Sequence, residues 1–298
     1  MKKLMHNIKW DSVNCHICES SEKEPIKINN EPLVDGQFGF SVHPVICKNC
    51  GLVFLGKRWS KEFYGIFYEN YYDDLYRLET KPEYGISAVI NNMDIIWNRI
   101  KPHIKDVDNK LNILDLGSSY GHGLKHLQTK LPNSNIFAIE SSPESIEVLQ
   151  SPEIGATLIT NDFDLDWENK YEDSMDIIVM RHVFEHVLDP LLTLKKIRKA
   201  LKKDGILYIA VPDIVNIRTN LRDYDNWWEY IFRSVHTYYY SKDTFIKTLQ
   251  IERLYPVEIQ EEQEEIWAVI KKDTKINFDF ENQYIKQLKV FEKYFNQL

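Results

Sequence analysis

The sequence lacks the features that would place the chain in or across a membrane. No apolar run approaches the roughly 20 residues that a helix needs to span a bilayer. The first ten residues contain no apolar core of a secretory leader. We therefore expect a cytoplasmic protein in a reducing compartment, where disulfides are rare. Internal repeats and low-complexity tracts are also missing, so nothing indicates a repeat architecture.

An excess of positive charge is missing as well. The formal net charge is −8, from 37 Lys and Arg residues against 45 Asp and Glu residues, whereas a sequence-independent grip on RNA needs basic side chains. The one dense basic cluster, Lys195 to Lys203, has helical spacing and is interpreted as a solvated helix face. We therefore do not expect a nucleic acid as a partner. The 298 residues, 43% of them hydrophobic, suffice for one α/β domain with a small appended lobe.

Cysteine is scarce, and its placement is informative. The four cysteines form two C-x-x-C pairs, Cys15-His-Ile-Cys18 and Cys47-Lys-Asn-Cys50. Two such pairs can place four thiolates tetrahedrally around one zinc ion. Two disulfides or unpaired buried thiols are the alternatives, and a reducing compartment disfavours disulfides. Because four sulfurs leave no open position for catalysis, we predict a structural zinc that stabilises a small zinc-ribbon-like lobe over residues 1–57.

An apolar strand near the middle of the chain runs into a loop that contains glycines. The strand is predicted at Leu111 to Leu116, and a helix from about Gly121 to Leu131 should follow the loop. Gly117 and Gly121 let the backbone turn sharply and approach a ligand closely. Backbone N–H groups converge at the start of such a helix, so this is the layout of a nucleotide-binding crevice.

Acidic residues distinguish the ligand of this crevice. Asp115 lies near the end of the strand, and Glu140 ends the next strand, where a carboxylate can accept both hydroxyls of a ribose. The dinucleotide fingerprint G-x-G-x-x-G is missing, because Ser119 and His126 fall where it needs glycine. A carboxylate at the strand end suits a cationic ligand better than a pyrophosphate.

Strands and helices alternate in the rest of this region. Five strand and helix units imply a doubly wound, Rossmann-like parallel sheet with the ligand at the carboxyl ends of its strands. A final antiparallel pair brings the sheet to seven strands. The last helix is expected to serve packing or the contact of a homo-oligomer. The further segments are strands at Ala156 to Thr160, Met175 to Met180, Ile206 to Val211, Ile251 to Ile259 and Glu265 to Lys271, and helices at Tyr84 to Ile104, Leu191 to Leu201, Thr244 to Leu249 and Phe278 to Leu298.

These features together resemble the class I S-adenosylmethionine (SAM)-dependent methyltransferases. Their first motif, D/E-x-G-x-G-x-G, begins here at Asp115, with Ser119 in place of the middle glycine. The stretch Arg181 to Pro190 contains H-V-x-E-H-V-x-D-P, which is also familiar in this family. The resemblance implies SAM as the cofactor, with Asp162 and Phe163 near its adenine. The cofactor-binding residues that it implies near the strand ends are Asp115, Gly117, Ser119, Gly121, Glu140, Asp162, Phe163 and Arg181.

Aromatic residues are dense in a predicted lid or linker at residues 58–83, which precedes a methyltransferase domain at residues 84–298. Most of them are interpreted as packing between the two parts. The second cysteine pair continues as C-x-x-C-G-L-V-F, which resembles methyltransferases whose chain then forms a tyrosine-rich lid. That resemblance implies that Tyr72 or Tyr76 closes over the cofactor.

A second aromatic segment, residues 212–240, follows the fifth strand, where this fold builds its acceptor pocket. Aromatic faces stack on the C–H faces of sugars, which favours a carbohydrate-derived acceptor. The lobe and this segment together resemble deoxysugar C-methyltransferases that act on nucleotide-linked sugars. Of their pocket motif Y-H-E-H-L-S-Y-F-S, the stretch Arg233 to Ser241 keeps the second histidine, one tyrosine and the serine. The candidate substrate residues are Trp227, Tyr239 and Arg233, whose guanidinium can anchor a phosphate or carboxylate.

Two histidines are candidates for the catalytic base. Methyl transfer is an in-line displacement, so most of the catalysis can come from positioning, but a base helps when the acceptor is a hydroxyl. His236 is the first candidate and His182, just past the fourth strand, the second. Either histidine could instead be a hydrogen-bonded structural residue. Glu185 and His186 are expected to orient their loop or cap the following helix.

Three functions remain open at this point. The first is a SAM-dependent methyltransferase that O-methylates a small acceptor such as a sugar or a sugar nucleotide used as a surface polysaccharide precursor, with C-methylation of a nucleotide sugar as its variant. The second is an RNA methyltransferase that reads RNA with the zinc lobe, which the acidic balance disfavours. The third is a non-catalytic SAM-binding scaffold, which only Ser119 suggests.

Overall fold

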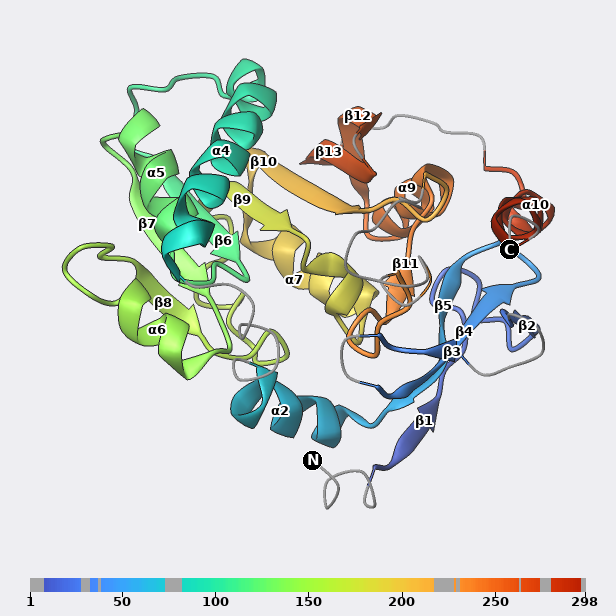
Figure 1. Ribbon diagram of the computed structural model, residues 1–298. Coiled ribbons are helices and arrows are strands. Elements are labelled where there is room, and N and C mark those ends of the chain that lie inside the picture. Colours follow the sequence, from blue (N-terminus) through green and yellow to red (C-terminus); the bar gives the residue numbers. More distant parts are fainter. Residues whose placement is uncertain are drawn as a thin grey trace.

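A mixed sheet of seven strands forms the centre of the computed structural model, which describes residues 8–27, 33–36, 39–72, 82–216, 228, 231–262, 264–273 and 280–295 (Figure 1). The strand order is β12-β13-β10-β9-β6-β7-β8. Strands β6 to β10 run parallel, and β13 lies antiparallel between β10 and β12. The predicted α/β fold class is therefore confirmed. The strands are β6 (Asn112–Leu116), β7 (Asn135–Ile139), β8 (Thr157–Thr160), β9 (Met175–Arg181), β10 (Leu201–Pro212), β12 (Leu254–Glu262) and β13 (Glu265–Lys272).

Successive residues of the central strands face two separate cores. In β6, Ile113 belongs to one buried apolar cluster and Leu114 to the other, and Ile177 and Ile178 of β9 divide in the same way. Burial on both faces explains why these strands are continuous apolar runs rather than alternating ones. Helices α4 (Pro82–Ile100), α5 (His122–Lys130) and α6 (Pro143–Leu149) supply the first core, and α7 (Pro190–Ala200) and α9 (Lys242–Ile251) supply the second.

Most predicted elements form, with shifted ends. Helix α9 begins after Ser241, whose side chain makes a capping box with Thr244. The helix continues to Ile251, so the strand predicted from that residue begins only at Leu254. Among the helices that the structure describes, none is long and apolar enough to cross a membrane.

The N-terminal lobe has a sheet of its own. The order of its main strands is β1-β5-β4-β2, with β3 paired to β4 and β11 paired to β5. Strand β11 comes from the end of the predicted acceptor segment, almost 180 residues further along the chain than β5. The acceptor segment and the lobe therefore share one sheet. Its strands are β1 (Trp10–Ser12), β2 (Lys23–Pro25), β3 (Leu33–Val34), β4 (Ser41–Cys47), β5 (Val53–Trp59) and β11 (Tyr238–Tyr239).

Two helices pack on this lobe. Helix α2 (Lys61–Asn70) follows β5, and its buried Phe63 and Phe67 contact Trp59. The last helix, α10 (Tyr284–Phe295), lies beside the lobe rather than on the seven-stranded sheet (Figure 1). Its Phe291 is 3% exposed and belongs to the same apolar cluster as Ile46. Packing is thus the observed role of α10, one of the two that the sequence allowed.

Candidate active site and cysteine cluster

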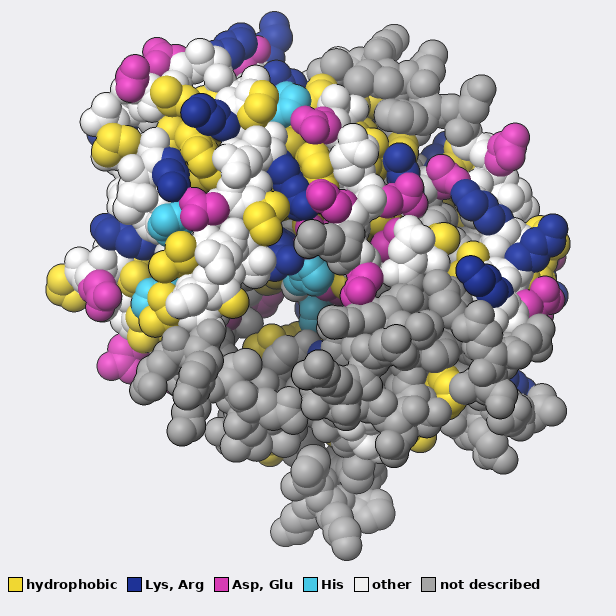
Figure 2. All heavy atoms as spheres, turned by 45° about the horizontal axis from the view of Figure 1, so that its top comes forward, with side chains coloured by type: hydrophobic (Ala, Val, Ile, Leu, Met, Phe, Trp, Pro, Cys, Tyr) yellow, Lys and Arg dark blue, Asp and Glu magenta, His cyan; other side chains and the backbone are white. Residues whose placement is uncertain are grey.

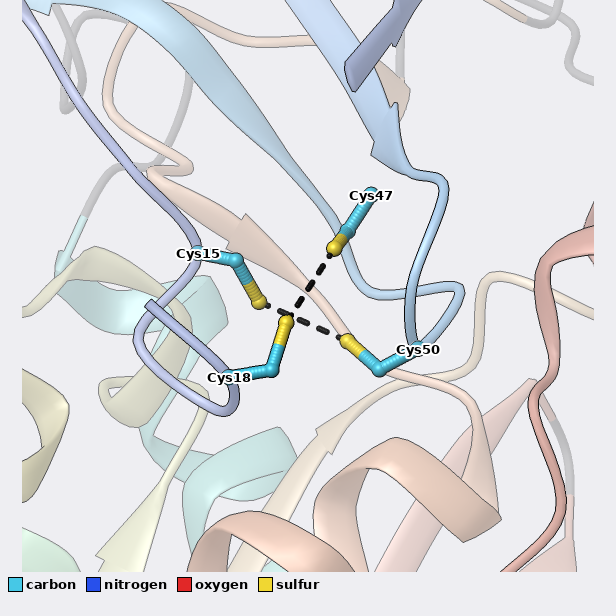
Figure 3. A group of neighbouring side chains, drawn as sticks. All are labelled: Cys15, Cys18, Cys47 and Cys50. Atoms are coloured by element: carbon cyan, nitrogen blue, oxygen red, sulfur yellow. Dashed lines mark hydrogen bonds between the residues drawn. The ribbon is translucent and has the colours of Figure 1, made fainter. Parts of the chain in front are cut away.

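Four cysteine sulfurs converge in the N-terminal lobe (Figure 3). The Sγ atoms of Cys15 and Cys50 lie 3.4 Å apart and those of Cys18 and Cys47 lie 3.5 Å apart. These distances are too long for a disulfide, and all four thiols are free. A tetrahedral zinc ion with bonds of about 2.3 Å separates its sulfurs by about 3.8 Å. The cluster could therefore hold a metal ion after a small expansion.

The second cysteine pair is held by the turn between β4 and β5. The N–H of Cys47 donates to the carbonyl of Leu52, and the carbonyl of Cys47 accepts from the N–H of Gly51. Gly51 has a φ of +82°, and a Cβ there would lie 2.4 Å from the backbone carbon of Gln283. Glycine is therefore required beside the cluster, where the segment that leads into α10 crosses the turn.

The glycine loop after β6 adopts left-handed conformations. Gly117 has a φ of 75° and Gly121 one of 78°, and a Cβ on Gly117 would lie 2.5 Å from the side chain of Val183. Ser119, which stands where the motif has its middle glycine, has a φ of 51°, at a cost of about 1 kcal/mol for a residue with a Cβ. The loop keeps its tight course despite the serine, and it passes directly against the segment that follows β9.

Glu140 ends β7 and fixes the loops around it. Its Oε2 accepts a hydrogen bond from the backbone N–H of Ser119 at 2.8 Å. Its Oε1 accepts from the N–H groups of Ser141 and Ser142 at 3.0 and 2.9 Å. These contacts hold the carboxylate beside the glycine loop, in the place where the sequence predicts a ribose.

Asp115 lies buried beside the same loop. Burial, together with the nearby charge of Glu140, raises the pKa of Asp115 to about 7. A cation bound between the two carboxylates would oppose both effects, because an opposite charge lowers the pKa of a carboxyl group. The pair therefore favours a positively charged ligand.

The residues predicted near adenine follow β8. Asp162 is exposed, and its Oδ1 accepts a hydrogen bond from the N–H of Asp164 at 2.8 Å. Phe163 is half-buried against the core. The structure thus places both beside the carboxyl end of β8, with the carboxylate of Asp162 stabilising the turn.

Lys196 of α7 stabilises this turn through hydrogen bonds. Its ammonium group donates to the carbonyl oxygens of three consecutive residues, Phe163 to Leu165, at 3.2, 2.7 and 2.9 Å. The side chain is only 4% exposed. The interpretation of Lys195 to Lys203 as a solvated face is therefore wrong at Lys196, because backbone carbonyls replace water around its charge.

A cavity of about 340 Å³ lies beside the carboxyl ends of β9 and β10. Figure 2 shows a hollow in one face of the molecule, with histidine, basic and acidic side chains gathered around it. Neither Asp115 nor Glu140 lines the cavity, which adjoins their crevice through the segment that contacts Gly117. The predicted Tyr76 and Trp227 lie outside the described residues. The predicted site residues that line the cavity are Tyr72, Arg181, His182, Arg233, His236 and Tyr239.

Glu265 contacts three basic side chains, an arrangement that sequence patterns did not reveal. It lies at the start of β13, and its carboxylate contacts Arg99 at 2.9 Å, Arg181 at 3.0 Å and His182 at 2.8 Å. Burial raises the pKa of Glu265, but the hydrogen bond from His182 and the charge of Arg181 outweigh it and lower the pKa to about 2. Arg181 thus lines the cavity; the sequence predicted it as a cofactor residue.

The two candidate bases have different surroundings. His182 has a φ of 52°, its side chain is 40% exposed, and its Nε2 contacts Glu265. His236 is enclosed, and burial lowers its pKa well below the usual range of histidine, with the nearby His186 and Arg233 acting in the same direction. The carboxylate of Glu265 therefore orients the His182 ring, whereas burial disfavours the charged form of His236.

Glu185 and His186 line the cavity rather than serving the next helix. They belong to the short 3-10 turn η2 (Phe184–His186). Asp189 caps α7 instead, because its Oδ1 accepts the N–H of Leu192 at 3.0 Å. Capping, one of the two roles that the sequence allowed, is therefore wrong, and the H-x-x-E-H spacing from His182 to His186 was the sequence signal that could have placed both residues in the cavity.

Solved structures of methyltransferases are similar to this chain. A chain from the complex of the Trm112 methyltransferase activator with a methyltransferase of Haloferax volcanii is 17% identical, with a TM-score of 0.46 over 66% of this chain and 97% of that one. A SAM-dependent methyltransferase of Clostridium acetobutylicum is 15% identical, with a TM-score of 0.46 over 72% and 98%. One from Mesorhizobium loti is 12% identical, with a TM-score of 0.45 over 59% and 97%. No curated protein matches the sequence.

The fold and the match to a protein family define the class of this protein, a SAM-dependent methyltransferase. A protein family described as a methyltransferase domain matches residues 84–251, which is more than half of the chain. The chain belongs to this family.

Proposed function

We propose that this methyltransferase transfers the SAM methyl group to a hydroxyl of a small, carbohydrate-derived acceptor bound in the cavity. The observation that carries the proposal is the cavity itself, which combines a carboxylate-supported histidine, a buried arginine and aromatic walls beside the cofactor crevice. Aromatic walls suit the C–H faces of a sugar ring. Arg233, 8% exposed, suits a phosphate or carboxylate on that acceptor.

The cofactor is placed by the two acidic strand ends. Asp115 holds the ammonium group of the amino-acid tail of SAM, and Glu140 accepts the hydroxyls of its ribose. The loop from Gly117 to Gly121 passes beneath them, and Asp162 with Phe163 receives the adenine. This arrangement directs the methyl group toward the segment after β9, which lines the acceptor cavity.

His182 is the base that this geometry favours. Its Nε2–H donates to the ionised Glu265, which leaves Nδ1 as the accepting nitrogen and stabilises the imidazolium that forms. As the acceptor oxygen attacks the methyl carbon, the carbon–sulfur bond breaks and S-adenosylhomocysteine leaves. The hydroxyl proton passes to His182 Nδ1. His236, whose protonation is costly, is a wall of the cavity in this mechanism.

The cysteine cluster binds a structural zinc ion in this proposal. Four thiolates complete a tetrahedral shell, so the ion contributes folding energy and no catalytic step. The lobe that it stabilises supplies β5, on which β11 and its cavity residue Tyr239 are paired.

Isotope-labelled SAM tests the acceptor class. The protein is incubated with methyl-labelled SAM and separate panels of free sugars, nucleotide sugars and short RNAs, and labelled products are identified by mass spectrometry. We expect label on an oxygen of a sugar or nucleotide sugar. Label on a ring carbon would show that the protein is a C-methyltransferase. Label on RNA alone would contradict the proposal and show an RNA methyltransferase.

Calorimetry with SAM distinguishes an enzyme from a scaffold. We expect binding in the micromolar range together with turnover of at least one acceptor, and the His182→Gln variant should bind SAM normally while turning over slowly. The His103→Gln variant, altered outside the cavity, is the matched control. Binding of SAM without any turnover across all three panels would support a scaffold instead.

A further inference from the structure

A second group of metal-ligating side chains lies in the acceptor cavity. Glu185, His186 and His236 each offer one ligand atom, and these atoms lie within 4.8 Å of one another. The first two come from the turn after β9 and the third from the segment before β11, so the fold assembles the group from two distant parts of the chain. We propose that these three residues bind a divalent transition-metal ion that keeps open coordination positions toward the acceptor.

The surroundings of the Glu185 carboxylate point to a ligand. Its side chain is buried, and its Oε2 has no hydrogen-bond partner among the residues that the structure describes. Its Oε1 lies 3.8 Å from His186 Nε2 and 3.8 Å from His182 Nδ1, and both distances are too long for a hydrogen bond. A buried carboxylate with an unsatisfied oxygen is costly, so this one calls for a group that is not part of the chain.

The spacing fits an ion. Bonds of about 2.1 Å separate two ligand atoms by about 3.4 Å at a tetrahedral angle and by about 4.2 Å when they are opposite each other. The observed 3.8 Å between Glu185 Oε1 and His186 Nε2 lies between these values. The ligand atoms lie up to 4.8 Å apart, so the widest pair must close by up to about 0.6 Å to stand opposite each other, or by up to about 1.4 Å to reach the tetrahedral separation. Side-chain rotations can supply such shifts.

His186 is oriented by a contact on the far side of its ring, as metal-binding histidines usually are. Its Nδ1 lies 3.2 Å from the hydroxyl of Tyr68. This contact uses one ring nitrogen and leaves Nε2, which lies 3.8 Å from Glu185 Oε1, for the ion. Two imidazoles and one carboxylate are a donor set that suits first-row transition metals.

The charges around the cavity accommodate a cation. With neutral histidines, its lining carries one net negative charge, which a divalent ion changes to one net positive charge. The site then suits an acceptor that presents two neighbouring oxygens, one to the ion and one to Arg233. The charged residues of the lining are the acids Glu185, Asp213, Glu264 and Glu265 and the bases Arg99, Arg181 and Arg233.

This role for the ion rests on the proposed function, but ion binding itself does not. The ion would hold the acceptor oxygen beside His182, whose Nδ1 faces the same carboxylate oxygen of Glu185. Oxygen activated between a metal and a base is a general way to generate a nucleophile near neutral pH.

Titration of the zinc-loaded protein with Co²⁺ tests the site without SAM or acceptor. We expect one Co²⁺ per chain, with the weak visible bands of nitrogen and oxygen ligands. A thiolate charge-transfer band would instead report exchange into the cysteine cluster and would count against the site. Glu185→Gln and His236→Gln should each weaken Co²⁺ binding at least about tenfold, and His103→Gln should leave it unchanged.

Circular dichroism and zinc content show whether each variant is folded. Absence of saturable Co²⁺ binding in the folded wild type overturns the inference, as does equal affinity in the folded Glu185→Gln and His236→Gln variants. Co²⁺ binding without transfer to any sugar would overturn the proposed function and leave the metal site standing. Sugar methylation that resists chelation, without Co²⁺ binding, would do the reverse.

Discussion

Tyr239, which lines the cavity, pairs in register with Val53, three residues beyond Cys50. The cysteine cluster and the cavity are therefore connected through a single pair of antiparallel strands. Thr237 adds to the connection, because its carbonyl accepts from the N–H of Leu55 and its own N–H donates to the carbonyl of Glu185.

Loss of the proposed zinc ion at the four cysteines should impair turnover of the acceptor more than binding of the cofactor. We expect Cys47→Ser to lower the free energy of unfolding by at least about 3 kcal/mol, since a structural zinc contributes folding energy directly. Turnover should be lost as β5 and β11 loosen, while the SAM affinity measured by calorimetry stays within about threefold. His43→Gln, in the same lobe, is the control that keeps its zinc. A Cys47→Ser protein with full zinc content and normal turnover would contradict this connection.

Asp115 and Glu140 should be separable with two ligands. Asp115→Ala should weaken SAM about 100-fold, because it removes the partner of a buried cation, yet leave adenosine binding nearly unchanged. Glu140→Gln should weaken SAM and adenosine alike, by about tenfold or more, because both carry the ribose. Equal losses for both ligands in the Asp115 variant would show that this carboxylate does not contact the amino-acid tail.

SAM binding should weaken in acid because Asp115 titrates near neutrality. Its pKa is raised to about 7, so below that pH the ligand must displace a proton, and the affinity should fall by up to about tenfold per pH unit. Above pH 7 the affinity should level off. Calorimetry from pH 5.5 to 8.5 measures this, and Asp115→Asn should flatten the profile.

Titration of the same carboxyl group should change the stability of the unliganded protein in the opposite sense: SAM affinity rises with pH, whereas stability falls. A raised carboxyl pKa means that the folded state favours the protonated form, so its contribution is fully present below pH 4 and is lost as the pH rises to about 7. The total is at most about 4 kcal/mol. Without ligand, Asp115→Asn should therefore be more stable than the wild type at pH 8 and similar to it at pH 4, as measured by urea unfolding.

The seven-stranded sheet was predictable because local patterns determine it. Strands buried on both faces appear in the sequence as apolar runs. Gly117 and Gly121 mark a turn whose backbone conformation favours glycine at both positions. The cysteine spacing likewise predicted a cluster whose four sulfurs the structure does bring together. Such features depend on residues that lie close together in the sequence.

The cavity was only partly predictable because it depends on long-range contacts. Glu265 reaches His182 from a strand more than 80 residues later, and no spacing rule connects the two. From the sequence, Glu185 and His186 were expected to orient their loop or to cap the next helix, but Asp189 is the residue that caps α7. The pairing of β11 with β5 is a third contact of this kind, since a sequence pattern shows a strand but not its neighbour.

Turnover should depend on His182 much more than SAM binding does. His182→Gln should lower kcat by about 100-fold or more, the usual contribution of a general base, with little change in the affinity for SAM. Glu265→Gln should lower kcat less and should also lower stability, because Arg99 and Arg181 lose a buried partner. If His236→Gln lowered kcat strongly at saturating metal while His182→Gln did not, the base would be His236.

Lys196 should matter for the adenine side of the cofactor although it touches no ligand in the proposed arrangement. Lys196→Met removes the ammonium donor from the carbonyl oxygens of Phe163, Asp164 and Leu165, of which Leu165 still accepts from the N–H of Trp167. We therefore expect the free energy of unfolding to fall by about 1–3 kcal/mol. The turn then no longer holds Asp162 and Phe163 in place, and the affinity for both SAM and adenosine should drop by about threefold to tenfold. Lys195→Met, one residue earlier on an exposed face of α7, is the matched control and should change neither quantity. If both variants behaved alike, the turn would be stable without its lysine, and its order would have to come from the packing of Phe163 against the core.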